Sequence, residues 1–444
     1  MFKKFPLLVL VFALAFLFGV SPLRAQSVTA TVVPEKFLVK TTLVKSYSLA
    51  DLKAMWKKTR KPEIIVPVSN GVNVYEITYK ALWIDKKTWI DCSGICYVPQ
   101  TSGKKVATAM YGHGTEVRKN RSIDDQDPQQ GICMLMAADG YLTLFPDYYG
   151  MGSGEGFHLY QHAWSEAMSF VYMLYAVEEL KKQQNVQGNG QLFLTGYSQG
   201  GHAAMAAHKY LEELNDPRFR VTAAVPMSGA YDMAGIQADY MHQKYPHPFY
   251  LPYLITSYQT AYKILDTENI YSIFVPPYDT LLPRFFGTNR QATYADIDKL
   301  LPEIPSIIIK PEFLKSYQSD PNFAFKVRLQ ENGLTNWKPK APLMLCACKG
   351  DREVNYQNST VAYDAMRKNG VTQIRLNNLS DKLDHNTCAA FAVLAMKHYF
   401  NRFRKDGKNP KMLDLPWLKK FLIGFVKRKE EKNYQKTQAD KAYH

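Results

Sequence analysis

The stretch Gly196-Tyr197-Ser198-Gln199-Gly200 decides the fold class, because its surroundings fit its pattern. It follows a short apolar run, residues 191–195, that is typical of a buried strand, and it precedes an alanine-rich run, residues 201–208, that is typical of a helix. A serine flanked by glycines at a strand-to-helix turn is the pattern of a nucleophile elbow. Such a turn strains the serine backbone, raises the hydroxyl above the sheet and aims helix N–H groups at developing negative charge. Ser198 is therefore the predicted nucleophile.

Strands and helices alternate along the chain on both sides of this elbow. An antiparallel pair, Val72–Leu82 and Thr88–Val98, is expected first, after a short helix that begins with the capping-box-like Ser48-Leu49-Ala50-Asp51. The predicted strands that follow are residues 106–111, 142–145, 191–195, 221–228, 342–348 and 373–376. The predicted helices include residues 133–138, 161–184, 201–208, 357–368 and 386–403. This alternation predicts a mostly parallel central sheet with helices on both faces.

The alternation breaks between residues 231 and 340, where the chain is rich in Tyr, Phe, Pro and Leu and shows helical fragments without a clear strand. An insertion of this length between two core strands predicts a mainly helical cap over the active site. The expected domain organisation is a signal peptide (1–25), the core in two parts (26–230 and 341–410), the cap (231–340) and a basic amphipathic tail (411–444).

A serine nucleophile needs an imidazole that takes its proton and a carboxylate that orients this imidazole. The search for them starts where the later strands end. Asp351 lies in a glycine turn directly after the strand at 342–348 and is the predicted acid, with Glu353 as the near rival. His385 ends the loop after the next strand and precedes the last helix, so it is the predicted base.

The oxyanion of the tetrahedral intermediate needs two backbone N–H donors. One is expected from Gln199, next to the nucleophile. The other is expected from the loop after residues 106–111, which reads Gly112-His113-Gly114-Thr115. Glycines let this backbone approach a substrate carbonyl. Thr115 is the preferred second donor and Gly114 the alternative.

Three stretches together resemble the α/β-hydrolase superfamily, and within it the secretory, lipase A-like family. They are Tyr111-Gly112-His113-Gly114-Thr115, Pro146-Asp147-Tyr148-Tyr149-Gly150-Met151-Gly152 and Gly196-Tyr197-Ser198-Gln199-Gly200-Gly201. The resemblance covers about residues 60–405 and implies an α/β-hydrolase fold and hydrolysis of carboxylic esters beneath a helical cap. It also implies that the segment 147–152 buttresses the site without belonging to the triad.

The N-terminus has the pattern of a secretory signal peptide. Phe2-Lys3-Lys4 is basic, residues 7–20 are apolar, and Leu23-Arg24-Ala25 is a cleavage candidate. We therefore expect a periplasmic or extracellular protein; an uncleaved N-terminal anchor is the alternative. The six cysteines are expected to be mostly buried thiols. One long-range disulfide remains open, with no pairing assigned.

The formal net charge is +15, part of which comes from the C-terminal tail. No basic stripe interleaved with aromatic residues and no zinc-finger or RNA-recognition motif is present, so nucleic-acid binding is not expected. No cofactor or metal is expected either. In the tail, Leu418, Phe421, Leu422 and Phe425 recur at helical spacing among lysines and arginines. Residues 415–429 could therefore contact a membrane surface, although docking on the protein itself is the favoured interpretation.

These features predict an exported serine esterase or lipase that acts on a small or lipid-like ester through an acyl-enzyme. A serine peptidase of the same fold is one alternative; however, prolyl-type peptidases carry a propeller that the roughly 80 mature residues before the strand at 106–111 cannot form. The other alternative is a non-catalytic binding protein on a hydrolase scaffold. Loss of a triad residue would be expected there, and none is lost. The oligomeric state is not predicted.

Overall fold

The computed structural model describes residues 33–58, 67–265, 269–405, 424 and 426–435. The predicted signal peptide (1–25) lies outside the described residues, as do the four apolar residues of the tail pattern, Leu418, Phe421, Leu422 and Phe425. Within the part that is described, no helix has the length and apolar character needed to span a bilayer.

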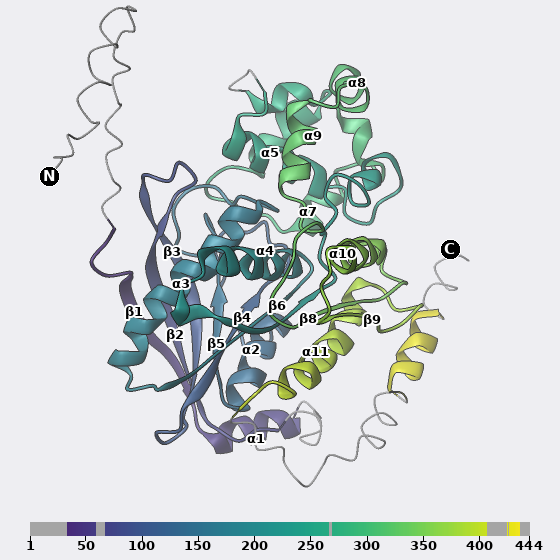
Figure 1. The fold of residues 1–444 in the computed structure, drawn as a ribbon. Helices are drawn as coiled ribbons and strands as arrows, with labels where there is room; N and C mark the ends of the chain where they lie inside the picture. The colour runs from purple at the N-terminus through teal and green to yellow at the C-terminus, as the bar shows by residue number, and fades with distance from the viewer. Residues whose placement is uncertain (1–32, 59–66, 266–268, 406–423, 425, 436–444) are drawn as a thin grey trace, which may run out of the picture. The chain divides into compact units, whose positions relative to one another are not determined.

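A nine-stranded sheet forms the centre of the molecule (Figure 1), in the order β1-β2-β3-β5-β4-β6-β7-β8-β9. The strands are β1 Leu38–Tyr47, β2 Val72–Leu82, β3 Trp89–Pro99, β4 Val106–Gly112, β5 Tyr141–Pro146, β6 Gly188–Tyr197, β7 Val221–Met227, β8 Leu343–Ala347 and β9 Ile374–Asn378. The pairings β1–β2, β2–β3 and β3–β5 are antiparallel, and all other pairings are parallel. The predicted mostly parallel sheet is confirmed.

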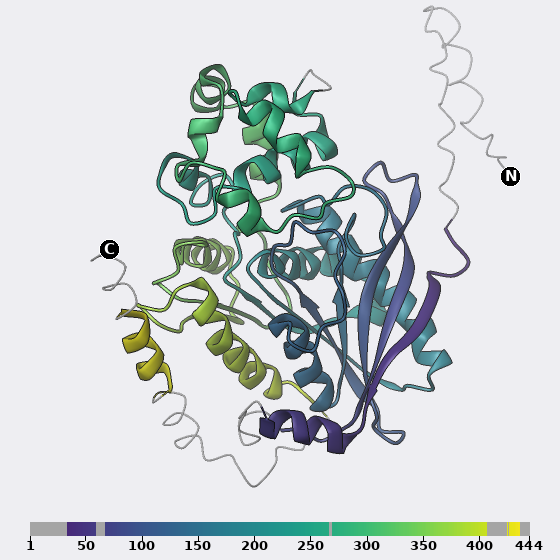
Figure 2. The same cartoon turned by 180° about the vertical axis from the view of Figure 1, so that it is seen from behind.

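Helices cover both faces of this sheet. Successive side chains of a strand point to opposite sides, so a strand that is apolar throughout needs a covering layer on each side. On β6, Phe193 packs with one apolar cluster and Leu192 and Leu194 with the other. The helices on the Phe193 side, seen in Figure 2, are α1 Leu49–Lys58, α2 Pro128–Ala138 and α11 His385–Asn401. Those on the opposite side are α3 Ala163–Gln183, α4 Gln199–Leu214 and α10 Gln357–Lys368.

Most predicted elements are confirmed within a few residues, including the capping box of α1, where Ser48 and Asp51 bond reciprocally. Strand β1 was not predicted. It is an edge strand whose residues are mostly exposed, and its register with β2 shifts twice, at Leu38/Lys40 and at Leu43/Lys45. Each shift interrupts the alternation of apolar and polar residues that identifies a strand.

The segment between β7 and β8, residues 231–340, is helical as predicted and has an apolar core of its own. Its α-helices, grouped together in Figure 1, are α5 Tyr250–Tyr262, α6 Tyr278–Leu281, α7 Tyr294–Asp298, α8 Pro311–Ser319 and α9 Ala324–Glu331. We call it the inserted segment. Among its described residues, strand-like pairing is limited to one isolated bridge, Phe274 with Ile309.

The cysteines divide into one disulfide and four buried thiols. Cys348 and Cys388 form the disulfide. The thiols are Cys92, Cys96, Cys133 and Cys346. The open question of the long-range disulfide is thus resolved by the pairing of the end of β8 with the first turn of α11.

Candidate active site

Ser198 occupies the sharp turn between β6 and α4. Its backbone has φ 60° and ψ −123°, a conformation that is costly for a residue with a side chain. Its neighbours leave no room for side chains: an added Cβ on Gly196 would lie 2.2 Å from the carbonyl oxygen of Gly200, and one on Gly200 would lie 1.9 Å from that of Gly112. The glycines of the sequence pattern are therefore required by contact between backbones.

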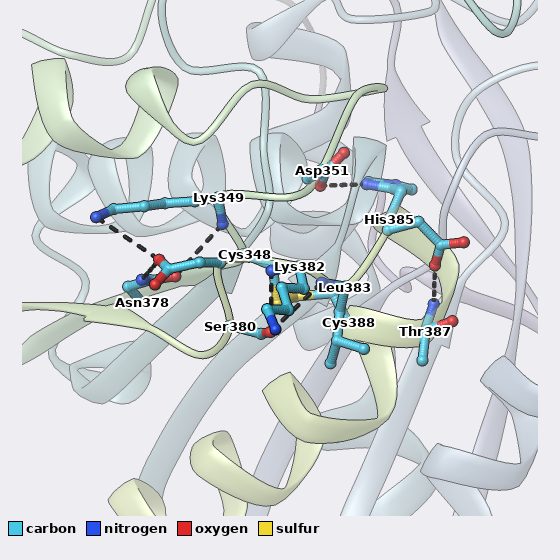
Figure 3. Close-up of a disulfide and its surroundings, with 12 residues drawn as sticks. Cys348, Lys349, Asp351, Asn378, Ser380, Lys382, Leu383, His385, Thr387 and Cys388 are labelled. Atoms are coloured by element: carbon cyan, nitrogen blue, oxygen red, sulfur yellow. Dashed lines mark hydrogen bonds and ion pairs between the residues drawn. A yellow bond between two sulfur atoms is a disulfide. The ribbon is translucent and has the colours of Figure 1, made fainter. Parts of the chain in front are cut away.

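Asp351 and His385 form a buried hydrogen-bonded pair (Figure 3). Asp351 lies in the turn after β8, and His385 is the first residue of α11. His385 Nδ1 is 2.6 Å from Asp351 Oδ2. The other carboxylate oxygen, Oδ1, accepts the backbone N–H groups of Glu353 and Val354, both at 2.9 Å. Because a carboxylate only accepts, Nδ1 carries the hydrogen, and Nε2 is left to accept a proton.

The charges around this pair raise the pKa of His385 and so favour the protonated form of its ring. Burial by itself would lower the pKa of His385, but the charge and hydrogen bond of Asp351, together with the charge of Glu353, outweigh burial and raise it. Of the two carboxylates that the sequence suggests as the acid, Asp351 is the one bonded to Nδ1. Glu353 Oε2 is instead 4.0 Å from Nε2, on the other side of the ring.

Ser198 and His385 open onto one cavity of about 790 Å³. This size lies within the range of small-molecule sites. Gly114 and Thr115 line the same cavity, so the structure brings the predicted nucleophile, base and donor loop together. Part of its wall comes from the inserted segment, through His247, Tyr250 and Tyr294.

The donor loop after β4 uses one of its two candidate N–H groups. Gly114 N–H donates to Gln129 Oε1 at 2.6 Å. The N–H groups of Thr115 and Gln199 have no acceptor among the described residues. The loop is held from behind by Tyr148, whose hydroxyl donates to the carbonyl of His113 at 2.9 Å. The segment 147–152, which includes Tyr148, thus touches the donor loop.

A buried network behind the elbow was not predicted from the sequence. The side-chain amide of Gln199 donates to Glu166 Oε1 at 2.8 Å and lies 2.9 Å from Nε2 of His158, while Glu166 Oε2 bonds Nδ1 of His202 at 2.6 Å. Burial lowers the pKa of His158 to about 3, so its neutral ring accepts from the amide. The signal in the sequence was limited to an acid, Glu166, and a histidine, His202, on otherwise apolar helices.

Within the described residues, no group of three or more His, Cys, Asp or Glu side chains is arranged to hold a metal ion. The polar groups of the cavity instead suit proton transfer and hydrogen bonding. A hydroxyl on a strained turn, an imidazole oriented by a carboxylate, and unpaired N–H groups are the parts of nucleophilic catalysis.

Comparison with known proteins finds solved structures of hydrolases that are similar to this chain. No protein-family model and no curated protein sequence matches it. The rice cell wall degrading esterase LipA of Xanthomonas oryzae is 22% identical, with a TM-score of 0.74, over 83% of this chain and 99% of that chain. A Legionella pneumophila protein assigned in general terms as a hydrolase is 27% identical, with a TM-score of 0.74, over 84% and 100%. Candida antarctica lipase A in its closed state is 13% identical, with a TM-score of 0.61, over 82% and 81%.

Proposed function

Because this chain has the α/β-hydrolase fold of the esterases and lipases that it matches, we propose that it is an exported serine hydrolase that cleaves carboxylic esters. One observation carries the proposal. Ser198 sits on a strained strand-to-helix turn, and the ring of His385, oriented by Asp351, opens onto the same cavity. The matched esterases and lipases support ester substrates over peptides.

The proposed reaction has two halves. His385 Nε2 takes the proton of Ser198 Oγ while Oγ attacks the ester carbonyl, and Asp351 stabilises the imidazolium. The negative oxygen of the tetrahedral intermediate accepts from the N–H groups of Thr115 and Gln199. His385 then gives its proton to the departing alcohol, which leaves an acyl-enzyme on Ser198. A water molecule, deprotonated by His385, hydrolyses this ester and restores the serine.

The hydrogen bonds support Thr115 over Gly114 as the second oxyanion donor. The N–H of Gly114 is already bonded to Gln129, so it would have to break that bond to serve the oxyanion. Preorganised donors are effective because they need no rearrangement during the reaction. Gln129 instead holds the loop in place.

We assign the inserted segment the role of a cap, with the core formed by residues 26–230 and 341–410. Two pockets reach Ser198, and the inserted segment contributes to both. The smaller pocket is lined mainly by apolar side chains of this segment, among them Met233, Met241, Leu251 and Leu254. This lining supports a cap that binds an apolar part of the substrate.

Export is part of the proposal and rests on the signal-peptide pattern of residues 1–25. The Cys348–Cys388 disulfide supports it, because disulfides persist in oxidising compartments such as the periplasm and the extracellular space. The alternative of an uncleaved anchor predicts a mature protein that keeps residues 1–25.

The test compares wild type with Ser198→Ala on p-nitrophenyl esters of increasing chain length. We expect kcat/KM to fall by about 10⁴-fold or more, as when a triad nucleophile is removed. Ser169→Ala is the control. It removes another buried hydroxyl, on α3, whose hydrogen bond is local to Glu166 O, and it should leave ester hydrolysis unchanged.

Equal rates in wild type and Ser198→Ala would reject the proposal. Cleavage of proline amides without cleavage of esters would favour the peptidase interpretation. Binding of an ester without turnover by wild type would favour a non-catalytic role. The chain-length series also separates an esterase from a lipase, because it reports the acyl length at which kcat/KM is highest.

A further inference from the structure

Two carboxylates face the ring of His385 from opposite sides. Asp351 bonds Nδ1 at 2.6 Å, and Glu353 Oε2 lies 4.0 Å from Nε2, the atom that must receive the proton of Ser198. Glu353 follows Asp351 by two residues in the same turn. Its side chain is mostly buried and lines the cavity next to Ser198.

The position of Glu353 is fixed by the inserted segment. His247 Nε2 lies 3.5 Å from Glu353 Oε1, and His247 Nδ1 bonds Asp298 Oδ2 at 2.7 Å. The Tyr245 hydroxyl donates to the backbone carbonyl of Glu353 at 2.7 Å. The carboxylate is therefore held by a histidine that is itself held by a second carboxylate.

His247 and Glu353 are both charged at neutral pH. Burial would lower the pKa of His247, but its hydrogen bond to Asp298 and its ion pair with Glu353 outweigh burial and raise the pKa to about 9, so the ring is charged at neutral pH. Burial would raise the pKa of Glu353, but the ion pair with His247 and the charge of His385 outweigh burial and lower this pKa, so the carboxylate is anionic.

We propose that Glu353 is a positioning residue for the ester hydrolysis, and that its anionic carboxylate, held by His247 and Asp298, stabilises the imidazolium of His385 from the Nε2 side. The inference rests on the proposed function, because it assigns His385 the role of the base. It extends the site beyond Ser198, Asp351 and His385 to groups that the inserted segment supplies.

The stabilisation acts mainly after proton transfer. A neutral His385 presents a lone pair at Nε2 and gains no hydrogen bond from a carboxylate. Once Nε2 carries the proton of Ser198, the ring is positive, and Glu353 attracts it across 4.0 Å in a largely buried setting. Interactions that strengthen on the way to the transition state raise the rate, whereas equal binding of both states does not.

The other charged groups around His385 come from several elements. On its own helix, Asp384 caps α11 by accepting the N–H of Thr387. From the inserted segment, the cation of His247 partly offsets Glu353. From the loop after β4, Glu116 lines the same cavity, and Asp127 and the pair of Asp139 with Lys397 lie on its wall along α2 and α11.

The proposed role of Glu353 predicts a change in the pH dependence of ester hydrolysis. His385 accepts a proton from Ser198 only when it is neutral, so the acid limb of kcat/KM reports its pKa in the free enzyme. Glu353 contributes to the raised pKa of His385. Removing the charge of Glu353 lowers that pKa, so the acid limb moves to lower pH. The plateau rate falls as well, because the imidazolium is less stabilised in the transition state.

The experiment measures kcat/KM on a p-nitrophenyl ester from pH 4.5 to 9.5 for Glu353→Gln and Glu353→Asp. For Glu353→Gln we expect the acid limb to move down by about one pH unit and the plateau to fall about tenfold. Glu353→Asp keeps the charge and should keep the limb near its wild-type position. The control Glu303→Gln removes an exposed carboxylate that pairs with Lys244 on the inserted segment, and it should change neither quantity.

The pH midpoint of the acid limb is a property of the folded, active molecules alone. Partial unfolding of a variant therefore lowers the plateau of kcat/KM without moving this midpoint. An acid limb that stays in place in Glu353→Gln, with activity still dependent on Ser198, overturns the role of Glu353 and leaves the proposed function intact. Undiminished hydrolysis by Ser198→Ala, measured in the same series, overturns both.

Discussion

At the scale of single residues, the contact between two backbones sets the geometry of the site. Gly112 on β4 pairs with Gly196 on β6, and the Cα of Gly200 lies against the same Gly112 carbonyl. The proposed donor loop begins at Gly112, and Ser198, the proposed nucleophile, lies between the other two glycines. Three glycines therefore bring Thr115 and Ser198 to the same cavity, because a side chain at any of them would push the two loops apart.

We predict that Gly200→Ala disrupts this contact. Its Cβ would lie 1.9 Å from the carbonyl oxygen of Gly112, and backbone atoms must move to relieve the overlap. We expect kcat/KM to fall at least 100-fold through misplacement of the oxyanion donors, and the free energy of unfolding to fall by about 1–3 kcal/mol. Ester hydrolysis and urea unfolding measure the two effects.

The control for this substitution is Gly287→Ala, because an added Cβ there meets no atom within 4 Å. It should change neither activity nor stability by much. Wild-type activity in Gly200→Ala would show that the close approach is not needed for catalysis.

At the scale of elements, the disulfide joins the two segments that carry the proposed acid, Asp351, and the proposed base, His385. Cys348 precedes Asp351 by three residues, and Cys388 follows His385 by three residues, so the cross-link lies close to the Asp351–His385 hydrogen bond (Figure 3). The end of β8 and the start of α11 are thus tied together covalently. The disulfide restrains the distance between these two hydrogen-bonded side chains.

We predict that the double variant Cys348→Ala/Cys388→Ala loses about 4 kcal/mol of unfolding free energy, because the bridge spans 40 residues and constrains the unfolded chain. Its kcat should also fall, since the orientation of His385 is less restrained. Urea unfolding and ester hydrolysis, each with and without reductant, provide the measurement.

The comparison variant Cys346→Ala removes a buried thiol of the same strand and keeps the bridge. Adding reductant should lower the unfolding free energy of Cys346→Ala, as it does for wild type. The unfolding free energy of the double variant should not change with reductant. A double variant as stable as wild type would contradict the argument.

The elements also show which parts of the fold could be read from the sequence. The parallel strands were predicted because they are short, apolar and followed by helices. The edge strand β1 was missed because its two register shifts break the alternation that the prediction uses. The disulfide could not be assigned, because its cysteines are separated by 40 residues that include α10 and β9. Pairing across such a distance depends on packing, which a local pattern does not contain.

Part of the candidate site could likewise be predicted from the sequence, and part of it could not. Ser198, Asp351 and His385 were predicted as one site because each follows a parallel strand, and the carboxyl ends of parallel strands meet at one edge of a sheet. The network of Glu166 with Gln199 and His202 was not found, since an acid on an apolar helix gives no sign of its partner. The contact between His247 and Glu353 depends on how the inserted segment folds, and for that segment the sequence indicated only helical fragments.

At the scale of the whole molecule, one buried arginine joins the inserted segment to the core. Arg290 is only 2% exposed. Its guanidinium donates to the carbonyls of Val117 and Gly150, each at 2.9 Å, and its charge lies 4.9 Å from the ring of Phe157. Val117 follows the donor loop and Gly150 belongs to the segment 147–152. Arg290 therefore links the proposed cap to the loops around the proposed oxyanion site.

We predict that Arg290→Ala loosens this connection. The substitution leaves two buried core carbonyls without their donor and removes the charge over Phe157, and we expect the unfolding free energy to fall by about 3 kcal/mol. If the inserted segment is a cap held by this residue, limited proteolysis should then cut first within residues 231–340. The control Arg284→Ala removes an exposed arginine of the same segment and should leave both the stability and the cleavage pattern as in wild type. Mass spectrometry of the fragments, together with urea unfolding, makes the measurement. First cuts in the core would contradict the proposed role of Arg290, because a loosened cap exposes its own loops before those of the sheet.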